Sequence, residues 1–206
     1  MPDVSRRSPQ TEWMDTEEVS EADFAACLRD LSTVNTLTLA RRPTLGFIAR
    51  ATKGTAAFSL LDIGFGDGDM LRAVARWAAR RGIAARLVGV DLNPNAAPAA
   101  SAATPADLAI DYRTGDYADQ PERFDLIVSS LVAHHMTAPQ LDRYLRFSET
   151  SSARGWLVND LHRLAVAHAA FPLLARTMRW HRIVREDGTL SVARSFRPAE
   201  WRAILD

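Results

Sequence analysis

Hydrophobic and polar positions follow different patterns before and after about residue 53. In the first part, apolar residues recur at helical spacing over Phe24–Leu31 behind a capping residue, Ser20, and predict a short amphipathic helix. A second helix is predicted from about Pro43, because proline is favoured in a first helical turn. We expect residues 19–52 to form an N-terminal helical cap. Residues 1–18 are polar and without periodicity, and they predict a mobile tail.

From residue 58 onward, short apolar runs alternate with helical stretches. This pattern is typical of β/α units whose parallel sheet is buried on both faces. The sequence therefore predicts an α/β domain over residues 53–206, a Rossmann-like parallel sheet flanked by helices. The predicted strands are 58–63, 87–90, 108–112, 124–128 and 156–158. The predicted helices lie at about 70–81, from Pro94, around 141–145 and at 163–180 with a bend at Pro172.

The end of the chain departs from the usual form of such sheets, which often finish with an antiparallel pair of strands. Here a turn is predicted at Glu186–Gly188 and a last helical turn or two from Pro198, up to Asp206. We expect the C-terminal strand pair to be missing or shortened. The fifth strand would then be an exposed edge unless residues 183–196 cover it.

Composition and charge narrow the classes of function. The chain has 206 residues, and Lys plus Arg equals Asp plus Glu at 25 each, so no overall positive field gathers nucleic acid. No apolar run reaches the ~18 residues of a membrane span. Cys27 is the only cysteine, which excludes an intrachain disulfide and a cysteine-rich zinc site. We expect a cytoplasmic protein that acts on a small molecule.

A glycine-rich turn between the first strand and its helix is suited to a ligand. Gly64, Gly66 and Gly68 permit positive φ angles and let a ligand approach the backbone closely. Asp67 and Asp69 stand at the start of the helix, where they favour the helix dipole but compete with a bound pyrophosphate. The turn therefore favours a ligand that carries positive charge.

Four segments in order resemble the class I methyltransferases that use S-adenosylmethionine (SAM). They are Leu-Asp-Ile-Gly-x-Gly-x-Gly, Val-Gly-Val-Asp, Thr-Gly-Asp-Tyr and Phe-Asp-Leu-Ile-Val-Ser-Ser, within residues 58–165. The resemblance implies a SAM-binding methyltransferase domain, with S-adenosylhomocysteine (SAH) as the product. Independently of the family, these segments fall at the carboxyl ends of predicted strands, the edge at which open α/β sheets bind ligands.

The resemblance also implies roles for individual residues. Asp62, with the backbone of Gly64 and Gly66, would hold the methionine part, whose ammonium and sulfonium suit an acidic cradle. Asp91 would accept both ribose hydroxyls, and Asp116 with its neighbour would meet the adenine. The full cofactor-binding set is Asp62, Gly64, Phe65, Gly66, Gly68, Asp91, Leu92, Asp116, Tyr117 and Ser129.

Histidines supply the candidates for chemistry. Methyl transfer is an in-line displacement, and only a protonated oxygen or nitrogen acceptor needs a base. The catalytic candidates are His162, paired with Asp160 after the fifth strand, and His135, while His134 is more simply a wall residue. No metal is expected, since the histidines lack a third ligand at a suitable spacing. Arg163 either clamps an acidic acceptor or pairs with Asp160.

The leading hypothesis is a SAM-dependent methyltransferase that methylates an oxygen of a phenolic or polyketide-type small molecule. Residues 159–163 and 194–200 resemble segments of bacterial methyltransferases found with polyketide or quinone pathways. The alternatives are an NAD(P)-dependent Rossmann oxidoreductase and a non-catalytic SAM-binding protein. A nucleic-acid methyltransferase is disfavoured because no Asn/Asp-Pro-Pro-Tyr signature follows the fourth strand. A homodimer is left open.

Overall fold

The computed structural model describes residues 4–16 and 19–206, which form two compact units. The first, called here the sheet unit, comprises residues 32–132 and 136–159. The second, called the helical unit, comprises the described residues up to 31, residues 133–135 and residues 160–206. Each unit is described by itself below.

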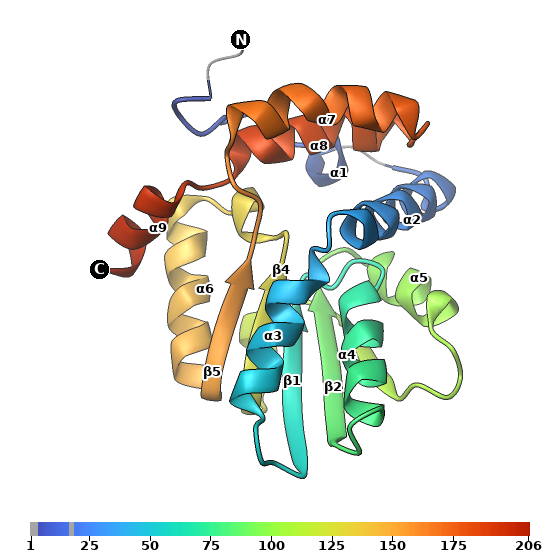
Figure 1. The fold of residues 1–206 in the computed structure, drawn as a ribbon, viewed down its shortest axis with the longest axis vertical. Helices are drawn as coiled ribbons and strands as arrows, with labels where there is room; N and C mark the ends of the chain where they lie inside the picture. The colour runs from blue at the N-terminus through green and yellow to red at the C-terminus, as the bar shows by residue number, and fades with distance from the viewer. Residues whose placement is uncertain (1–3, 17–18) are drawn as a thin grey trace. The chain divides into compact units, whose positions relative to one another are not determined.

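The sheet unit contains a five-stranded parallel sheet with the strand order β3-β2-β1-β4-β5 (Figure 1). Leu60 of the central strand lies opposite Leu87 on one side and Leu126 on the other. The strands are β1 (Ala57–Ile63), β2 (Ala84–Asp91), β3 (Ile110–Thr114), β4 (Phe124–Ser130) and β5 (Ser152–Asn159). All five predicted strands are confirmed. The strands β2 and β5 begin earlier than predicted because their first residues pair with a neighbouring strand without being buried.

Three helices share one apolar core with the sheet. They are α3 (Arg41–Ala51), α4 (Asp69–Ala79) and α5 (Ala96–Ala103). Figure 1 draws α3 and α4 in front of the sheet. Ile48 of α3, Leu71 of α4 and Ala100 of α5 are completely buried in this core beside Leu60. The unit also contains the short helix η1 (Tyr117–Asp119) and α6 (Ala138–Ser151), so the predicted Rossmann-like fold is confirmed.

The helical unit is built from short helices and one isolated strand-like bridge. Its elements are α1 (Trp13–Thr16), the first part of α2 (Glu21–Leu37), η2 (Ala133–His135), α7 (Ala165–Thr177), α8 (Arg182–Arg194) and α9 (Pro198–Leu205). Ser20 caps α2 by accepting a hydrogen bond from the backbone of Asp23 at 3.2 Å, as predicted. However, α2 is longer than the short helix that the sequence predicts.

The predicted turn at Glu186–Gly188 is wrong, because these residues lie inside α8. Gly188 instead serves close packing: a side chain there would collide with the ring of Phe171 from α7. Helices α8 and α9 occupy residues 182–194 and 198–205, and no strand occurs among the described residues after β5. The strand β5 is an edge of the sheet.

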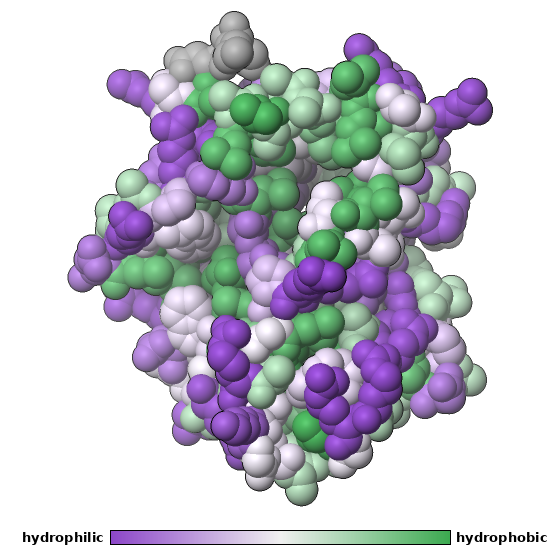
Figure 2. Space-filling view, viewed as in Figure 1, coloured by the Kyte–Doolittle hydropathy of each residue, from purple (hydrophilic) through white to green (hydrophobic). Residues whose placement is uncertain are grey.

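The apolar stretch that forms α7 is largely exposed. Trp180 is buried, but Val166 and Leu173 are 80% and 71% exposed. Figure 2 shows apolar residues gathered at the surface where Figure 1 places α7. In the described residues, every helix is too short or too polar to traverse a lipid bilayer.

The segment predicted as a tail lies partly outside the described residues, at 1–3 and 17–18. In its described part, Val4 and Glu12 are buried, and the backbone N–H groups of Trp13 and Met14 donate to Asp187. The division into tail, cap and catalytic domain stays a prediction.

Substitution of Asp125 tests how the strands are held together. Its carboxylate accepts hydrogen bonds from the backbone N–H and the hydroxyl of Ser59 at 2.8 and 3.0 Å, which hold its pKa below the usual range. Asp125→Ala should lower the free energy of unfolding by about 1.5–3 kcal/mol at pH 7. Because a lowered pKa stabilises only above the unfolded value, the deficit should shrink as the pH falls below about 4. Urea unfolding at pH 3 and pH 7 measures both effects, and an equal deficit at the two values would contradict the role of the charge.

Candidate active site

The turn between β1 and α4 requires glycine at three positions. Gly64, Gly66 and Gly68 have φ angles of +72°, +57° and +75°. A side chain at position 64 would collide with Val132, and one at position 68 with the hydroxyl of Tyr112. The sequence predicted this turn correctly. Its backbone is consequently the surface that a ligand would meet.

Two of the carboxylates at this turn already have cationic partners. Asp67 forms an ion pair with Arg72 at 2.9 Å and accepts the backbone N–H of Asp69 at 3.0 Å. Asp69 forms an ion pair with Arg41 of α3 at 2.8 Å. The start of α4 is therefore less negative than the sequence indicates, because the two arginines offset the two aspartates.

Asp62 is the carboxylate that remains uncompensated. It is 1% exposed at the end of β1, and neither oxygen accepts a hydrogen bond within the described residues. Burial, followed by the charges of Asp69 and Asp91, raises its pKa well above the usual range. A buried anion without a partner is unfavourable unless a cation offsets it. The residues present therefore fit a ligand whose charged end is an ammonium or a sulfonium, as SAM has.

Asp91 links the end of β2 to the glycine turn. Its two oxygens accept the backbone N–H groups of Gly66 at 3.0 Å and Asn93 at 2.9 Å. Each carboxylate oxygen has a second lone pair, so both can still accept from a hydroxyl. Leu92 follows and is 73% exposed. The ribose role expected of Asp91 is compatible with these contacts and stays a prediction.

Asp116 and Tyr117 lie at the short helix η1, where a residue missed by the sequence joins them. Asp116 caps η1 through the backbone N–H of Ala118 and forms an ion pair with Arg143 of α6 at 2.7 Å. Tyr117 is buried against Phe147. The only signal for Arg143 was its place on the outer face of a helix, which did not specify a partner.

Two predicted cofactor residues have side chains that pack inside the protein. Phe65 is buried, lies 4.9 Å from the ring of Tyr112 and fills the space above Gly89. Ser129 is completely buried and accepts a hydrogen bond from Tyr144 at 2.8 Å. A ligand would meet these two residues through their backbone, and their roles stay predictions.

In the helical unit, Asp160 pairs with His134. One oxygen lies 2.6 Å from Nδ1 of His134, and the other accepts the backbone N–H of the same residue at 2.7 Å. Both side chains are buried. The expected pairing of Asp160 with His162 is absent: the side chain of His162 is exposed, and its backbone forms a bridge with Phe196. Because η2 directs both the backbone N–H and the ring Nδ1 of His134 at Asp160, His134 is the better-placed partner. The sequence alone could not show this.

Arg163 has neither of the roles expected for it. It is 1% exposed and donates to the carbonyls of Val4 and Ser195. It also forms an ion pair with Glu200. These contacts make Arg163 a structural residue of the helical unit.

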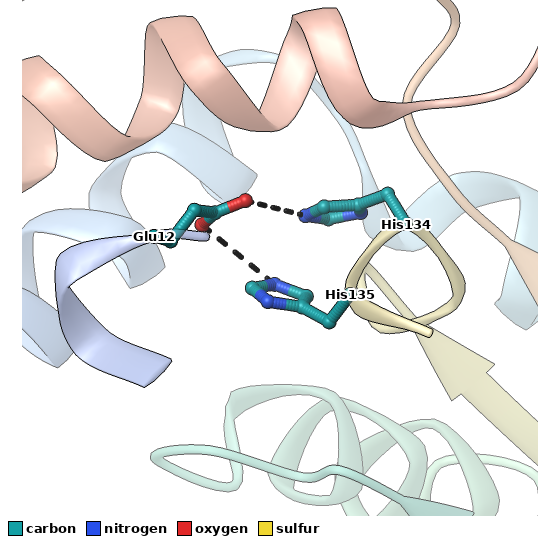
Figure 3. A group of neighbouring side chains, drawn as sticks. All are labelled: Glu12, His134 and His135. Carbon is teal, nitrogen blue, oxygen red and sulfur yellow. Dashed lines mark ion pairs between the residues drawn. The ribbon is translucent and has the colours of Figure 1, made fainter. Parts of the chain in front are cut away.

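Glu12 joins the histidines and was missed entirely by the sequence. Its Oε1 lies 3.7 Å from Nε2 of His134, and its Oε2 lies 3.8 Å from Nε2 of His135 (Figure 3). The two imidazole rings are tilted against each other with their centres 4.2 Å apart. Because Glu12 stands in a polar segment without periodicity, its sequence context offered no signal.

Comparisons with known proteins find methyltransferases among the proteins similar to this chain. A methyltransferase domain model matches residues 60–150, and no curated protein sequence matches the chain. The plantazolicin methyltransferase BpumL, solved with a monoazolic desmethylPZN analog and SAH, is 16% identical over 90% of this chain and 74% of its own, with a TM-score of 0.63. The plantazolicin methyltransferase BamL, solved with a triazolic desmethylPZN analog and SAH, is 17% identical over 94% and 68% of the two chains, with a TM-score of 0.62.

A third similar structure is the magnesium protoporphyrin IX methyltransferase from Synechocystis PCC 6803 with SAH bound. It is 13% identical over 81% of this chain and 72% of its own, with a TM-score of 0.55. Identities this low establish a shared fold. The matched domain, residues 60–150, includes the glycine turn, Asp91 and Asp116.

Asp62→Asn tests the charge of the site. The raised pKa of Asp62 means that its contribution to stability is lost as the pH rises above about 4 toward the folded value. Without SAM, the variant should therefore match the native chain near pH 4 and exceed its free energy of unfolding by about 1–3 kcal/mol at pH 8. Its affinity for SAM should fall at least about tenfold, as titration calorimetry would measure. The exposed Asp119→Asn is the control, and unchanged SAM affinity in Asp62→Asn would remove Asp62 from the site.

Gly68→Ala tests the close approach at the glycine turn. The substituted residue would meet both an unfavourable positive φ and the hydroxyl of Tyr112, whereas Gly54→Ala at φ +77° meets nothing nearby. We expect Gly54→Ala to cost about 1–2 kcal/mol of stability and Gly68→Ala to cost more and to weaken SAM binding. Thermal unfolding and calorimetry of both variants isolate the collision. Equal losses in the two variants would contradict it.

Proposed function

We propose that this chain, a SAM-dependent methyltransferase by its matched domain and its class I fold, methylates an oxygen of a small phenolic or polyketide-type acceptor. The observation that carries this proposal is the buried pairing of Asp160 with His134, next to His135. A hydroxyl acceptor must lose a proton during transfer, and a positioned base can accept that proton. An imidazole oriented by a carboxylate is suited to that task.

The donor half of the proposal uses the sheet unit. Asp62 and the backbone of the glycine turn would hold the methionine end of SAM, and Asp91 would bind its ribose. SAM supplies the methyl group as a sulfonium, and the protein's part is to position the donor and exclude water. The pair Asp62 and Asp91 favours this cationic nucleoside over NAD, because the anionic pyrophosphate of NAD would meet the uncompensated carboxylate of Asp62 at the glycine turn.

The acceptor half uses residues that follow two neighbouring strands in the chain. Ala133 comes three residues after the end of β4, and Asp160 comes directly after β5. The carboxyl ends of parallel strands share the edge at which such sheets bind ligands. The similar structures are named as methyltransferases of very different acceptors, plantazolicin and magnesium protoporphyrin IX, so the fold itself selects neither of them. Phenolic acceptors are favoured by the resemblance of residues 159–163 and 194–200 to polyketide-pathway and quinone-pathway enzymes.

The proposal is tested with a panel of phenols and hydroxyquinones, SAM and mass spectrometry of the products. We expect a gain of one methyl group on oxygen. Asp160→Asn and His135→Ala should lower kcat by about 10²–10⁴-fold without changing the affinity for SAM. His162→Ala should change kcat less than about threefold, because its side chain is exposed and lies outside the pair.

The controls separate the competing hypotheses. Tight binding of NAD without binding of SAM would support an oxidoreductase. Binding of SAM without turnover of any acceptor would support a non-catalytic binding protein. A loss in His162→Ala as large as that in Asp160→Asn would return the catalytic role to His162. The cytoplasmic location and the homodimer stay predictions, the latter to be measured by light scattering.

A further inference from the structure

Glu12, His134 and His135 bring three potential metal ligands together in the helical unit (Figure 3). Their ligand atoms all lie within 4.8 Å of one another. Glu12 and His134 are buried, and the side chain of His135 is 30% exposed. Two imidazoles and one carboxylate form a donor set that binds Zn²⁺ and other first-row divalent ions in proteins.

Asp160 orients one of these donors in the way that metal sites require. One oxygen of its carboxylate lies 2.6 Å from Nδ1 of His134, and Nε2 of the same ring faces Glu12 at 3.7 Å. In metal sites a ligating histidine almost always donates its second ring nitrogen to a carboxylate or a carbonyl, which fixes the tautomer and raises ligand basicity. Asp160 thus gives His134 the supporting contact of a metal ligand before any ion binds.

Arg194 fixes the backbone that carries the cluster. It is buried, and its guanidinium donates to the carbonyls of His134, His135 and Gln10 at 3.2, 3.0 and 2.6 Å. These three bonds hold η2 and the segment before Glu12 in one arrangement. Preorganised ligands lose less entropy when they bind an ion.

Two contacts of Glu12 oppose tight binding of a cation. The Nε of Arg194 lies 3.7 Å from its Oε1, and the hydroxyl of Ser191 donates to its Oε2 at 2.9 Å. Arg7 also donates to the carbonyl of His134 and adds a second positive charge. The negative charges of Glu12 and Asp160 balance these two guanidiniums. We therefore expect an affinity on the order of micromolar, weaker than that of structural zinc sites.

We propose that this cluster binds a Zn²⁺-type divalent cation through Nε2 of His134, Nε2 of His135 and a carboxylate oxygen of Glu12. The ligands need only contract until each lies about 2.0–2.2 Å from the ion. Three protein ligands leave a fourth position for water or for an oxygen of the acceptor. A metal-bound hydroxyl has a lowered pKa, so with the ion bound the metal, in place of the two ligating imidazoles, would promote the proton loss that the proposed function requires. Only this last role rests on the proposed function, since the ion can bind whatever the acceptor is.

Cobalt titration of the metal-stripped full chain tests the site directly. Tetrahedral Co²⁺ absorbs visible light, and Zn²⁺ should displace it with loss of that absorption. We expect one equivalent to bind with a Kd of about 1–10 μM, near −8 to −7 kcal/mol. Zn²⁺ should also raise the unfolding temperature of the native chain, because it binds the folded state.

Variants show whether the ion is held by this cluster. His135→Ala and Glu12→Gln should abolish the cobalt absorption, and Asp160→Asn should weaken binding about 10–100-fold. His135→Ala is the key variant, because the partly exposed ring can be removed with little loss of packing, and circular dichroism confirms that it folds. Glu186→Gln, an exposed glutamate of α8 in the same unit, is the matched control and should bind like the native chain.

The metal-binding experiments can fail or succeed independently of the methylation assay. A Kd above about 100 μM in the native chain would overturn the metal proposal and leave a purely protein-based polar cluster. Binding retained in His135→Ala and Glu12→Gln would equally overturn it, because the ion would then sit elsewhere. Methylation that persists after chelation would leave the methyltransferase proposal intact, whereas cobalt binding without methylation would support the site alone.

Discussion

The proposed donor site depends on one buried carboxylate, Asp62, that has no cationic partner within the described residues. Arg72 and Arg41 offset Asp67 and Asp69, but Asp62 has no hydrogen-bond partner within the described residues. The glycine turn brings backbone without side chains to the same place. Burying the charged form of Asp62 costs free energy. A neutral or anionic ligand would not offset that cost, whereas a cationic ligand would offset it. The expected preference for a sulfonium donor thus follows from the lack of a partner for Asp62 among the described residues as much as from any contact at the glycine turn.

The parts of this protein that the sequence predicted are those set by local rules. The five strands follow from short apolar runs, and the glycine turn follows from positions that need positive φ. The mistakes arose where tertiary packing decides. Gly188 looked like a turn residue, yet it lies in a helix and provides room for Phe171. A glycine in a turn and a glycine that makes room for a neighbouring helix cannot be told apart from the sequence. Only the position of the neighbouring helix distinguishes them.

The sequence pointed to polar residues after the fourth and fifth strands but paired them wrongly. His134, His135, Asp160 and His162 were singled out as candidates for chemistry, and their catalytic roles stay predictions. Proximity in sequence suggested His162 as the partner, whereas η2 brings His134 to both oxygens of Asp160. Glu12 and Arg194 come from distant segments without any motif, so their contribution could be recognised only in three dimensions.

Arg163 makes the N-terminal segment a structural part of the helical unit. Two of its bonds end on main-chain oxygens, those of Val4 and Ser195, and a third reaches Glu200. Cleavage by a protease after the first helix would remove one of these acceptors and leave a guanidinium in an apolar interior with one fewer partner, a costly loss for a charged donor. The amino-terminal residues therefore support the histidines in two ways: Glu12 contacts them, and Val4 anchors the arginine that follows Asp160 and His162.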